Sequence, residues 1–194
     1  SNSENGVDIV VEGSYDEAEG QYNLHIGGNG IISVDYEFVT KIEIHPRQIG
    51  VVLFLPATYD ELSWKRQGIW STYPDDHIGR NQGLAKAFRA HTYPKSVARA
   101  KPPWPWNLDS NEMGTKDFRA TRTQIQYAAL KDSEGTGIAI HSDGSQQVRS
   151  FIEGELTGMI ISDFYGAGLG SFSGEQWKTE LFKDKLPAGT VISG

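Results

Sequence analysis

Short segments in which apolar or β-branched residues alternate with polar ones recur along the chain, and they constrain its fold more than any other feature. Strands show this period of two because successive side chains point to opposite faces of a sheet. The segments predicted as strands are 7–11, 21–26, 31–39, 49–55, 62–65, 121–130, 137–141, 148–152, 158–164 and 177–182. So many short strands are typical of a sandwich or a barrel.

Glycine-containing turns are expected between several of these segments. Gly28-Asn29-Gly30, Glu134-Gly135 and Asp143-Gly144 can adopt the positive φ that tight hairpin turns require. One short helical turn is expected at 82–90, and no segment predicts the long helices that a parallel sheet needs for its crossovers. The predicted fold class is therefore all-β, with antiparallel strands.

Composition and charge exclude several classes of function. The chain of 194 residues contains no Cys, which excludes disulfide scaffolds, thiolate zinc sites and cysteine nucleophiles. Its 25 acidic residues outnumber 18 basic ones, so it lacks the positive field that nucleic acid or an anionic lipid surface requires. The longest apolar run, 49–55, is far shorter than a bilayer span. Neither nucleic acid nor a membrane is an expected partner.

The domain organisation is predicted to be simple. Residues 1–6 lack the apolar core of a signal peptide and are interpreted as a tag or linker remnant of something longer. Residues 7–194 are predicted to form a single domain. A proline-rich stretch at 92–111 interrupts the strand pattern, because proline cannot donate to a ladder, and it predicts a long surface loop.

The densest group of chemically active side chains lies at 62–80. Sugar sites combine a flat aromatic ring with carboxylate, guanidinium and amide groups that bond hydroxyls, and this segment contains both kinds of group. The residues predicted to bind carbohydrate are Trp70, Tyr73, Asp75, His77 and Arg80, together with Trp104 and Trp106 of the proline-rich stretch. The structural alternative is that Trp64 and Trp70 pack in a core and that Asp75 or Asp76 caps a turn.

The sequence predicts no catalytic residue, metal ion or cofactor. Asp75, Asp76 and His77 are adjacent, and adjacent residues of a strand point to opposite faces. A calcium ion held by one of these carboxylates and by loop carbonyls is the alternative. The serines at 170–174 do not match a nucleophile elbow, and the glycine-rich 166–170 is interpreted as a turn because no helix follows it. Sequence alone cannot pair carboxylates for glycoside hydrolysis.

The order of several motifs resembles the C-terminal domain of the β-galactosidases of glycoside hydrolase family 2. The resemblance covers most of the chain, from about Gly20 to Trp177. The matching segments are 50–56, 62–64, Gly68, 73–75, 111–114, 117–119, 130–132 and 135–138, with 166–170 and Trp177 as a looser match to a glycine-rich turn. The chain departs from the pattern at three places: Ser71-Thr72 replace Glu-Asn, Asp76-His77 stand where the family has Arg after Asp, with Arg80 three further on, and the sugar-facing Trp of the family falls near Met159.

This resemblance implies a galactose-mutarotase-like β-supersandwich. It also implies an accessory role, in which the domain contributes to the rim of a substrate cleft and to carbohydrate recognition. The two catalytic glutamates of these enzymes lie in a separate barrel, which would belong to the same parent chain and would be this domain's partner. The chain by itself is therefore expected not to hydrolyse glycosides.

Two other functions stay open. An autonomous carbohydrate-binding module would target a galactose-containing glycan and would show measurable, weak affinity in isolation. An aldose 1-epimerase, whose fold resembles that of this family, would need a His acid and a Glu base, for which His77 with Glu153 or Glu155 are the candidates. The compartment is not determined, although a secreted or periplasmic bacterial protein is favoured over a cytoplasmic one.

Overall fold

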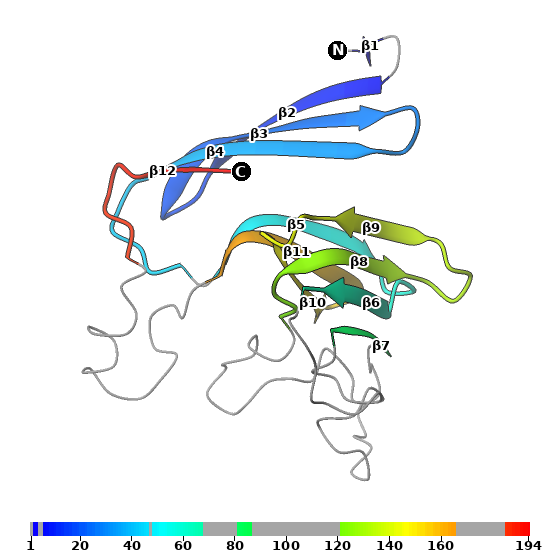
Figure 1. Ribbon diagram of the computed structural model, residues 1–194. Helices are drawn as coiled ribbons and strands as arrows, with labels where there is room; N and C mark the ends of the chain where they lie inside the picture. Colours follow the sequence, from blue (N-terminus) through cyan, green and yellow to red (C-terminus); the bar gives the residue numbers. More distant parts are fainter. Residues whose placement is uncertain (1, 4–5, 47, 68–80, 87–120, 166–184) are drawn as a thin grey trace, which may run out of the picture. The chain divides into compact units, whose positions relative to one another are not determined.

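The computed structural model describes residues 2–3, 6–46, 48–67, 81–86, 121–165 and 185–194 (Figure 1). Within this part of the chain every regular element is a β-strand and none is a helix, so the prediction of an all-β fold with antiparallel sheets is confirmed. The chain divides into two compact units, unit 1 with residues Ser1–Ile49 and Tyr165–Gly194, and unit 2 with residues Gly50–Phe164. The expectation of a single domain at 7–194 stays a prediction.

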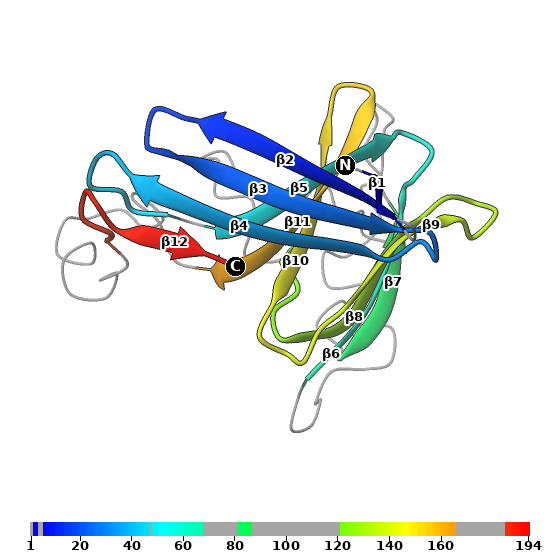
Figure 2. The same cartoon turned by 90° about the horizontal axis from the view of Figure 1, so that it is seen from above.

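Unit 1 is an antiparallel sheet in the order β1-β2-β3-β4-β12 (Figure 2). Its strands are β1 (Asn2–Ser3), β2 (Gly6–Ser14), β3 (Ala18–Gly27), β4 (Ile32–Thr40) and β12 (Val191–Ser193). Thr40, the last residue of β4, bonds to the segment that precedes β12. Its Oγ1 donates to the carbonyl of Pro187 at 2.6 Å and accepts the N–H of Thr190 at 2.9 Å. Neither β1 nor β12 is among the predicted strands.

The strands of unit 1 place apolar and polar side chains on opposite faces. One face, read from the register, carries Val7, Ile9, Val11, Tyr22, Leu24, Ile26, Ile32, Val34, Tyr36, Phe38 and Ile192. The rings of Tyr22 and Phe38 pack on it at 4.9 Å between centroids. The other face carries Asp8, Glu12, Ser14, Glu19, Gln21, Asn23, His25, Ser33, Asp35, Glu37 and Ser193, with Val10, Val39 and Val191 among them. Half-buried strands are expected to alternate in this way.

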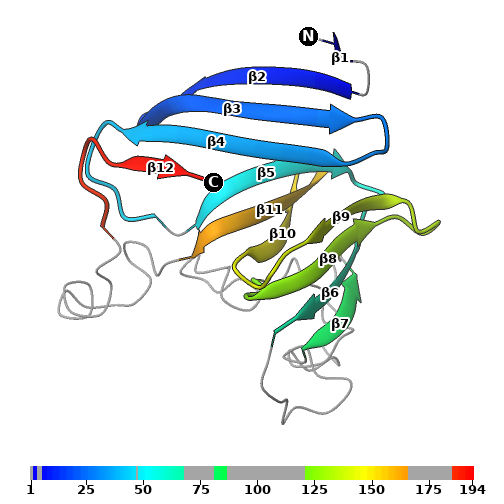
Figure 3. The ribbon, with the colours of Figure 1, turned by 45° about the horizontal axis from the view of Figure 1, so that its top comes forward.

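Unit 2 contains two sheets that share one core (Figure 3). The first has the order β10-β11-β5, with β10 (Gln147–Glu153), β11 (Leu156–Tyr165) and β5 (Gln48–Pro56). The second has the order β7-β6-β8-β9, with β7 (Gln82–Lys86), β6 (Glu61–Arg66), β8 (Ile125–Lys131) and β9 (Gly137–His141). The core consists of Leu62, Trp64, Ala85, Ile125, Ala128, Leu130, Val148, Met159 and Ile161. Because both sheets contribute to it, unit 2 is built as a β-sandwich.

Trp64 lies at the centre of this core with 3% of its surface exposed, and the guanidinium of Arg122 lies 4.3 Å from its ring centroid. A Cβ on Gly83, its cross-strand partner, would overlap the indole ring. The interpretation of Trp64 as core packing is therefore confirmed. Met159 is equally buried, at 1% exposed, and so does not present a side chain to a sugar.

The glycine turns adopt the backbone that the sequence predicts. Gly30, Gly135 and Gly144 have φ values of 82°, 84° and 103°. In the hairpin that joins β8 to β9, Oδ1 of Asp132 accepts the backbone N–H groups of Glu134 and Thr136, both at 2.9 Å. This Asx arrangement fixes the turn and thereby the register of the two strands.

The Asp132→Ala variant is expected to lose about 1 kcal/mol of unfolding free energy, because it removes both acceptor contacts while the freed N–H groups can still bond to water. Asp132→Asn keeps an oxygen at the same position and should retain most of the stability. Urea denaturation of the two variants beside the unmodified protein measures the difference. Equal midpoints for Ala and Asn would show that the turn does not depend on this acceptor.

The helical turn expected at 82–90 is wrong where the structure describes it, since residues 82–86 form β7. Ala85 faces the core at 1% exposed and its neighbour Leu84 faces out at 45%. The pairing of Leu62 with Ala85 and of Trp64 with Gly83 holds the segment extended, and this tertiary contact overrides a helical propensity. The predicted strand at 177–182 lies outside the described residues.

Candidate functional site

All the residues predicted to bind carbohydrate lie outside the described part of the chain. These are Trp70, Tyr73, Asp75, His77 and Arg80, within 68–80, and Trp104 and Trp106, within 87–120. Their proposed role stays a prediction, and so does the calcium alternative at Asp75 or Asp76. The structure does show where the two segments are attached to the sandwich.

The segment at 68–80 is attached to the β7-β6-β8-β9 sheet at one end, where β6 ends and β7 begins. The segment at 87–120 leaves from Lys86 at the opposite end of β7 and returns before β8 at the same end as 68–80. The N–H of Arg66 donates to the carbonyl of Asn81 at 2.7 Å, so the connection from β6 to β7 leaves and returns at one point. The N–H of Gln67 donates to the carbonyl of Gln124 at 2.7 Å, which places the start of β8 beside it. We call the group formed by Gln67, Asn81, Gln124 and Ser142 the strand-end rim; Ser142 joins it through a bond from its N–H to the carbonyl of Gln126 at 3.2 Å.

The backbone of β8 is irregular where it meets the strand-end rim. Gln124 has a φ of 56° and is the non-glycine residue with positive φ in the described part of the chain. Lys65 pairs with Tyr127 but Arg66 pairs with Ile125, so Gln126 is the extra residue of a β-bulge. The bulge turns Ile125 into the core, at 0% exposed, although strict alternation would place it on the face of Tyr127. Such irregularities cluster at functional sites.

The loop that follows β9, residues 142–146, lies next to the strand-end rim. The hydroxyl and the N–H of Ser145 bond to Asp143 and hold the pKa of its carboxyl below the ordinary value, so this side chain is ionised at neutral pH. Gly144 has a φ of 103°, a conformation that L side chains rarely adopt, and the side chain of Gln67 lies close to it. Gln146 continues the polar series by donating from Nε2 to Oδ1 of Asp163 at 2.9 Å.

The strand-end rim provides amide and hydroxyl groups, and the carboxylates of Asp143 and Asp163 lie in the loop and strand that follow it. These are the groups that bind sugar hydroxyls. Sequence reasoning missed these residues, because isolated Gln, Asn and Ser carry no motif. Among the described residues, no group of three or more His, Asp or Glu side chains is arranged to hold a metal ion.

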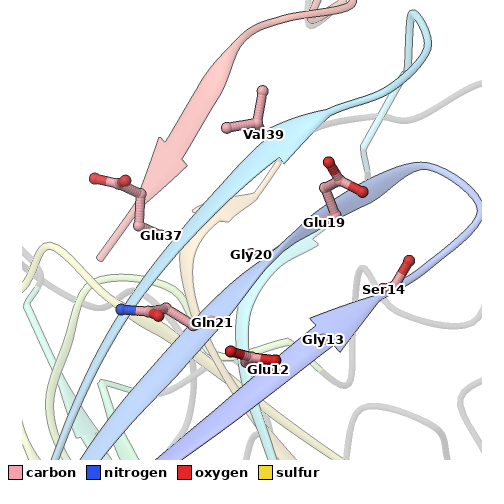
Figure 4. Close-up of a pocket in the computed structure, with 8 residues that line it drawn as sticks. All are labelled: Glu12, Gly13, Ser14, Glu19, Gly20, Gln21, Glu37 and Val39. Carbon is pink, nitrogen blue, oxygen red and sulfur yellow. The ribbon is translucent and has the colours of Figure 1, made fainter.

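The acidic face of unit 1 is hollowed at one place (Figure 4). The open hollow has a volume of about 720 Å³ and lies over the backbone of Gly13 and Gly20. It is lined by Glu12, Gly13, Ser14, Glu19, Gly20, Gln21, Glu37 and Val39. No lysine or arginine of the described strands shares this face, so the three carboxylates make the hollow negative. It lacks the aromatic ring that a sugar site requires.

Asp8, His25 and Ser33 form a row on the same acidic face, in the order of a catalytic triad. Oδ1 of Asp8 lies 2.6 Å from Nδ1 of His25. The imidazole of His25 lies over Gly6 of β2: a Cβ added to Gly6 would be 3.0 Å from Nε2. The ring thus points away from Ser33, and the row lacks the contact between base and nucleophile that a triad needs.

The residues considered for epimerase chemistry are only partly described. Glu153 ends β10 and Glu155 lies in the turn before β11, both exposed, whereas His77 lies outside the described residues. The epimerase alternative therefore stays untested. His141 ends β9 with its side chain exposed, and its ring centroid lies 5.2 Å from that of Tyr127.

No family model matches the sequence of this chain, and no curated protein matches it either. No helix of the described residues is both long and apolar enough to cross a membrane.

Proposed function

We propose that this chain is an accessory β-sandwich domain of a family 2, β-galactosidase-like glycosidase, with a galactose-mutarotase-like fold. Its role is to contribute to the rim of a substrate cleft and to carbohydrate recognition, while the catalytic glutamates lie in a barrel of the same parent chain. The ligand class is a galactoside or a galactose-containing glycan.

The β8–β9 hairpin is the observation that carries this proposal. The resemblance implies a strand pair at 130–138, and three residues of this motif have a physical role in the hairpin. Asp132 caps the turn, Gly135 supplies the positive φ, and a Cβ on Gly137 would overlap the carbonyl of Leu130. A motif whose residues fit the same hairpin supports descent from the same domain.

The strand-end rim supports the carbohydrate part of the proposal. The segment that holds Trp70 leaves and returns at this end, next to amide and carboxylate groups. The segment that holds Trp104 and Trp106 returns to the sandwich at the same end, before β8. Sugar-binding sites combine aromatic rings with amide and carboxylate groups of this kind.

Saturation-transfer NMR on the chain, with galactose, lactose and galactan oligosaccharides as separate ligands, tests the proposal. We expect weak transfer to the galactosyl ring, because sugar hydroxyls exchange bonds with water at little net gain. Transfer should fall in Trp70→Ala, Trp104→Ala or Trp106→Ala and persist in Tyr15→Ala, a control at an exposed tyrosine of unit 1. Incubation with lactose should release no galactose.

The outcomes separate the competing functions. Affinity for galactan oligosaccharides more than about tenfold above that for galactose, or roughly 1.4 kcal/mol, would favour an autonomous carbohydrate-binding module. Galactose release from lactose would contradict the non-catalytic role, and mutarotation of α-galactose followed by polarimetry would indicate an epimerase. Silence with all three ligands would contradict carbohydrate recognition by this chain.

A further inference from the structure

Four side chains form a row across the outer face of the β7-β6-β8-β9 sheet in unit 2. Three of the four lie within two residues of a residue of the strand-end rim along the chain. Lys65 of β6 pairs with Gln82 of β7 on one side and with Tyr127 of β8 on the other, and Tyr127 pairs with His141 of β9. Directly opposed residues of neighbouring strands point to the same face. We call Gln82, Lys65, Tyr127 and His141 the cross-strand row.

The cross-strand row faces away from the core. Trp64, Ala128 and Ile140 point into the sandwich. Their sequence neighbours Lys65, Tyr127 and His141 therefore point outward. Gln82, Lys65 and His141 are exposed and Tyr127 is half-buried. The row is therefore accessible, and the core does not need it.

The chemistry of the row matches one sugar ring. Tyr127 and His141 present two rings with centroids 5.2 Å apart and planes inclined by 57°, which offers an apolar surface for C–H groups. Lys65 is the direct cross-strand neighbour of Tyr127, and Gln82 is the next residue of the row. Both side chains can donate to hydroxyl oxygens on this face.

The position of the row links it to the proposed site. Gln67 follows Lys65 by two positions and Asn81 precedes Gln82, so the segment at 68–80 is attached directly beside the row. The β-bulge at Gln126 determines which side chains of β8 point outward here. It allows Ile125 to enter the core while Tyr127 stays on the outer face.

We propose that the cross-strand row is a galactoside-binding subsite that continues the strand-end rim, with Tyr127 as its aromatic contact and Lys65 as its main hydrogen-bond donor. This inference rests on the proposed function, and it adds a binding surface from residues that no motif singles out.

The same sheet provides a matched control. Lys86, Glu61, Lys131 and Gly137 form the equivalent row at the opposite end. It carries an ion pair between Lys86 Nζ and Glu61 Oε2 at 3.5 Å, and it has no aromatic ring. A sugar should not bind there, so Lys131→Ala controls for the loss of a lysine on this face.

Titration of galactose and lactose into the isotope-labelled chain, followed by amide NMR shifts, tests the subsite without a mutation. The amides of Lys65, Gln82, Tyr127 and His141 should shift with one common dissociation constant, and those of Lys86 and Lys131 should not. In the same titration, Tyr127→Ala should raise the dissociation constant at least about fivefold, close to 1 kcal/mol, whereas Tyr127→Phe should retain the affinity and Lys65→Ala should weaken it. Circular dichroism checks that each variant is folded.

The results distinguish this inference from the function on which it rests. If Trp70→Ala abolishes binding while Tyr127→Ala and Lys65→Ala bind as the unmodified chain does, the subsite is overturned and carbohydrate recognition stands. If no sugar shifts any amide, both are overturned. Shifts of the cross-strand row and the strand-end rim that are lost in Tyr127→Ala support the subsite.

Discussion

Replacement of Trp64 by Ala is expected to lower the unfolding free energy of unit 2 by about 3–5 kcal/mol, the usual cost of truncating a buried aromatic side chain. The indole ring lies between residues of both sheets at 3% exposed. Its loss opens a cavity in the centre of the sandwich and removes the ring surface against which the Arg122 guanidinium lies at 4.3 Å. Stability of only about 5–15 kcal/mol is typical of a domain, so this variant should be close to unfolding.

Urea denaturation followed by far-ultraviolet circular dichroism measures the loss, and amide exchange of β6 and β8 assigns it to unit 2. Leu84→Ala is the control, because Leu84 lies on the neighbouring strand with 45% of its surface exposed and should cost less than about 0.5 kcal/mol. A similar midpoint for the two variants would contradict the central position of Trp64 in the core.

Replacement of Gly20 by Val is expected to destabilise unit 1 by about 1–3 kcal/mol or more, the range for overpacking a well-packed site. A Cβ at this position would overlap the carbonyl of Glu37 and would lie 2.6 Å from the Cα of Phe38. These are backbone atoms of β4, so relief requires the two strands to move apart rather than a side chain to rotate.

Gln21→Val is the matched control for Gly20→Val, since the next residue of β3 points to the exposed opposite face, where a β-branched residue is favoured. Thermal unfolding and amide exchange across β2, β3 and β4 compare the two. Loss of protection in Gly20→Val but not in Gln21→Val is the expected result. Equal protection would mean that β4 adjusts to the added side chain without cost.

The strands and turns that were predicted correctly share a local cause. Alternation within 21–26 or 137–141, and the glycines at 30, 135 and 144, depend on neighbouring residues only. The turn at Asp132 likewise forms from contacts within a few residues. Such signals are written in the sequence itself.

The candidate site was less predictable. The aromatic residues chosen from composition lie outside the described residues, while the strand-end rim and the cross-strand row consist of residues with no local signature. Lys65, Gln82, Tyr127 and His141 become neighbours only through the register of four strands. A one-residue change of that register would separate them.

The sequence by itself determined that the chain is an all-β protein with antiparallel strands, because strand periodicity and turn chemistry act over a few residues. Tertiary structure alone decided that 82–86 is a strand, that β12 returns to pair with β4, and that Ile125 enters the core through a bulge. Each of these depends on pairing between segments remote along the chain. The free energy of such pairing comes from burial and ladder bonds that no local pattern encodes.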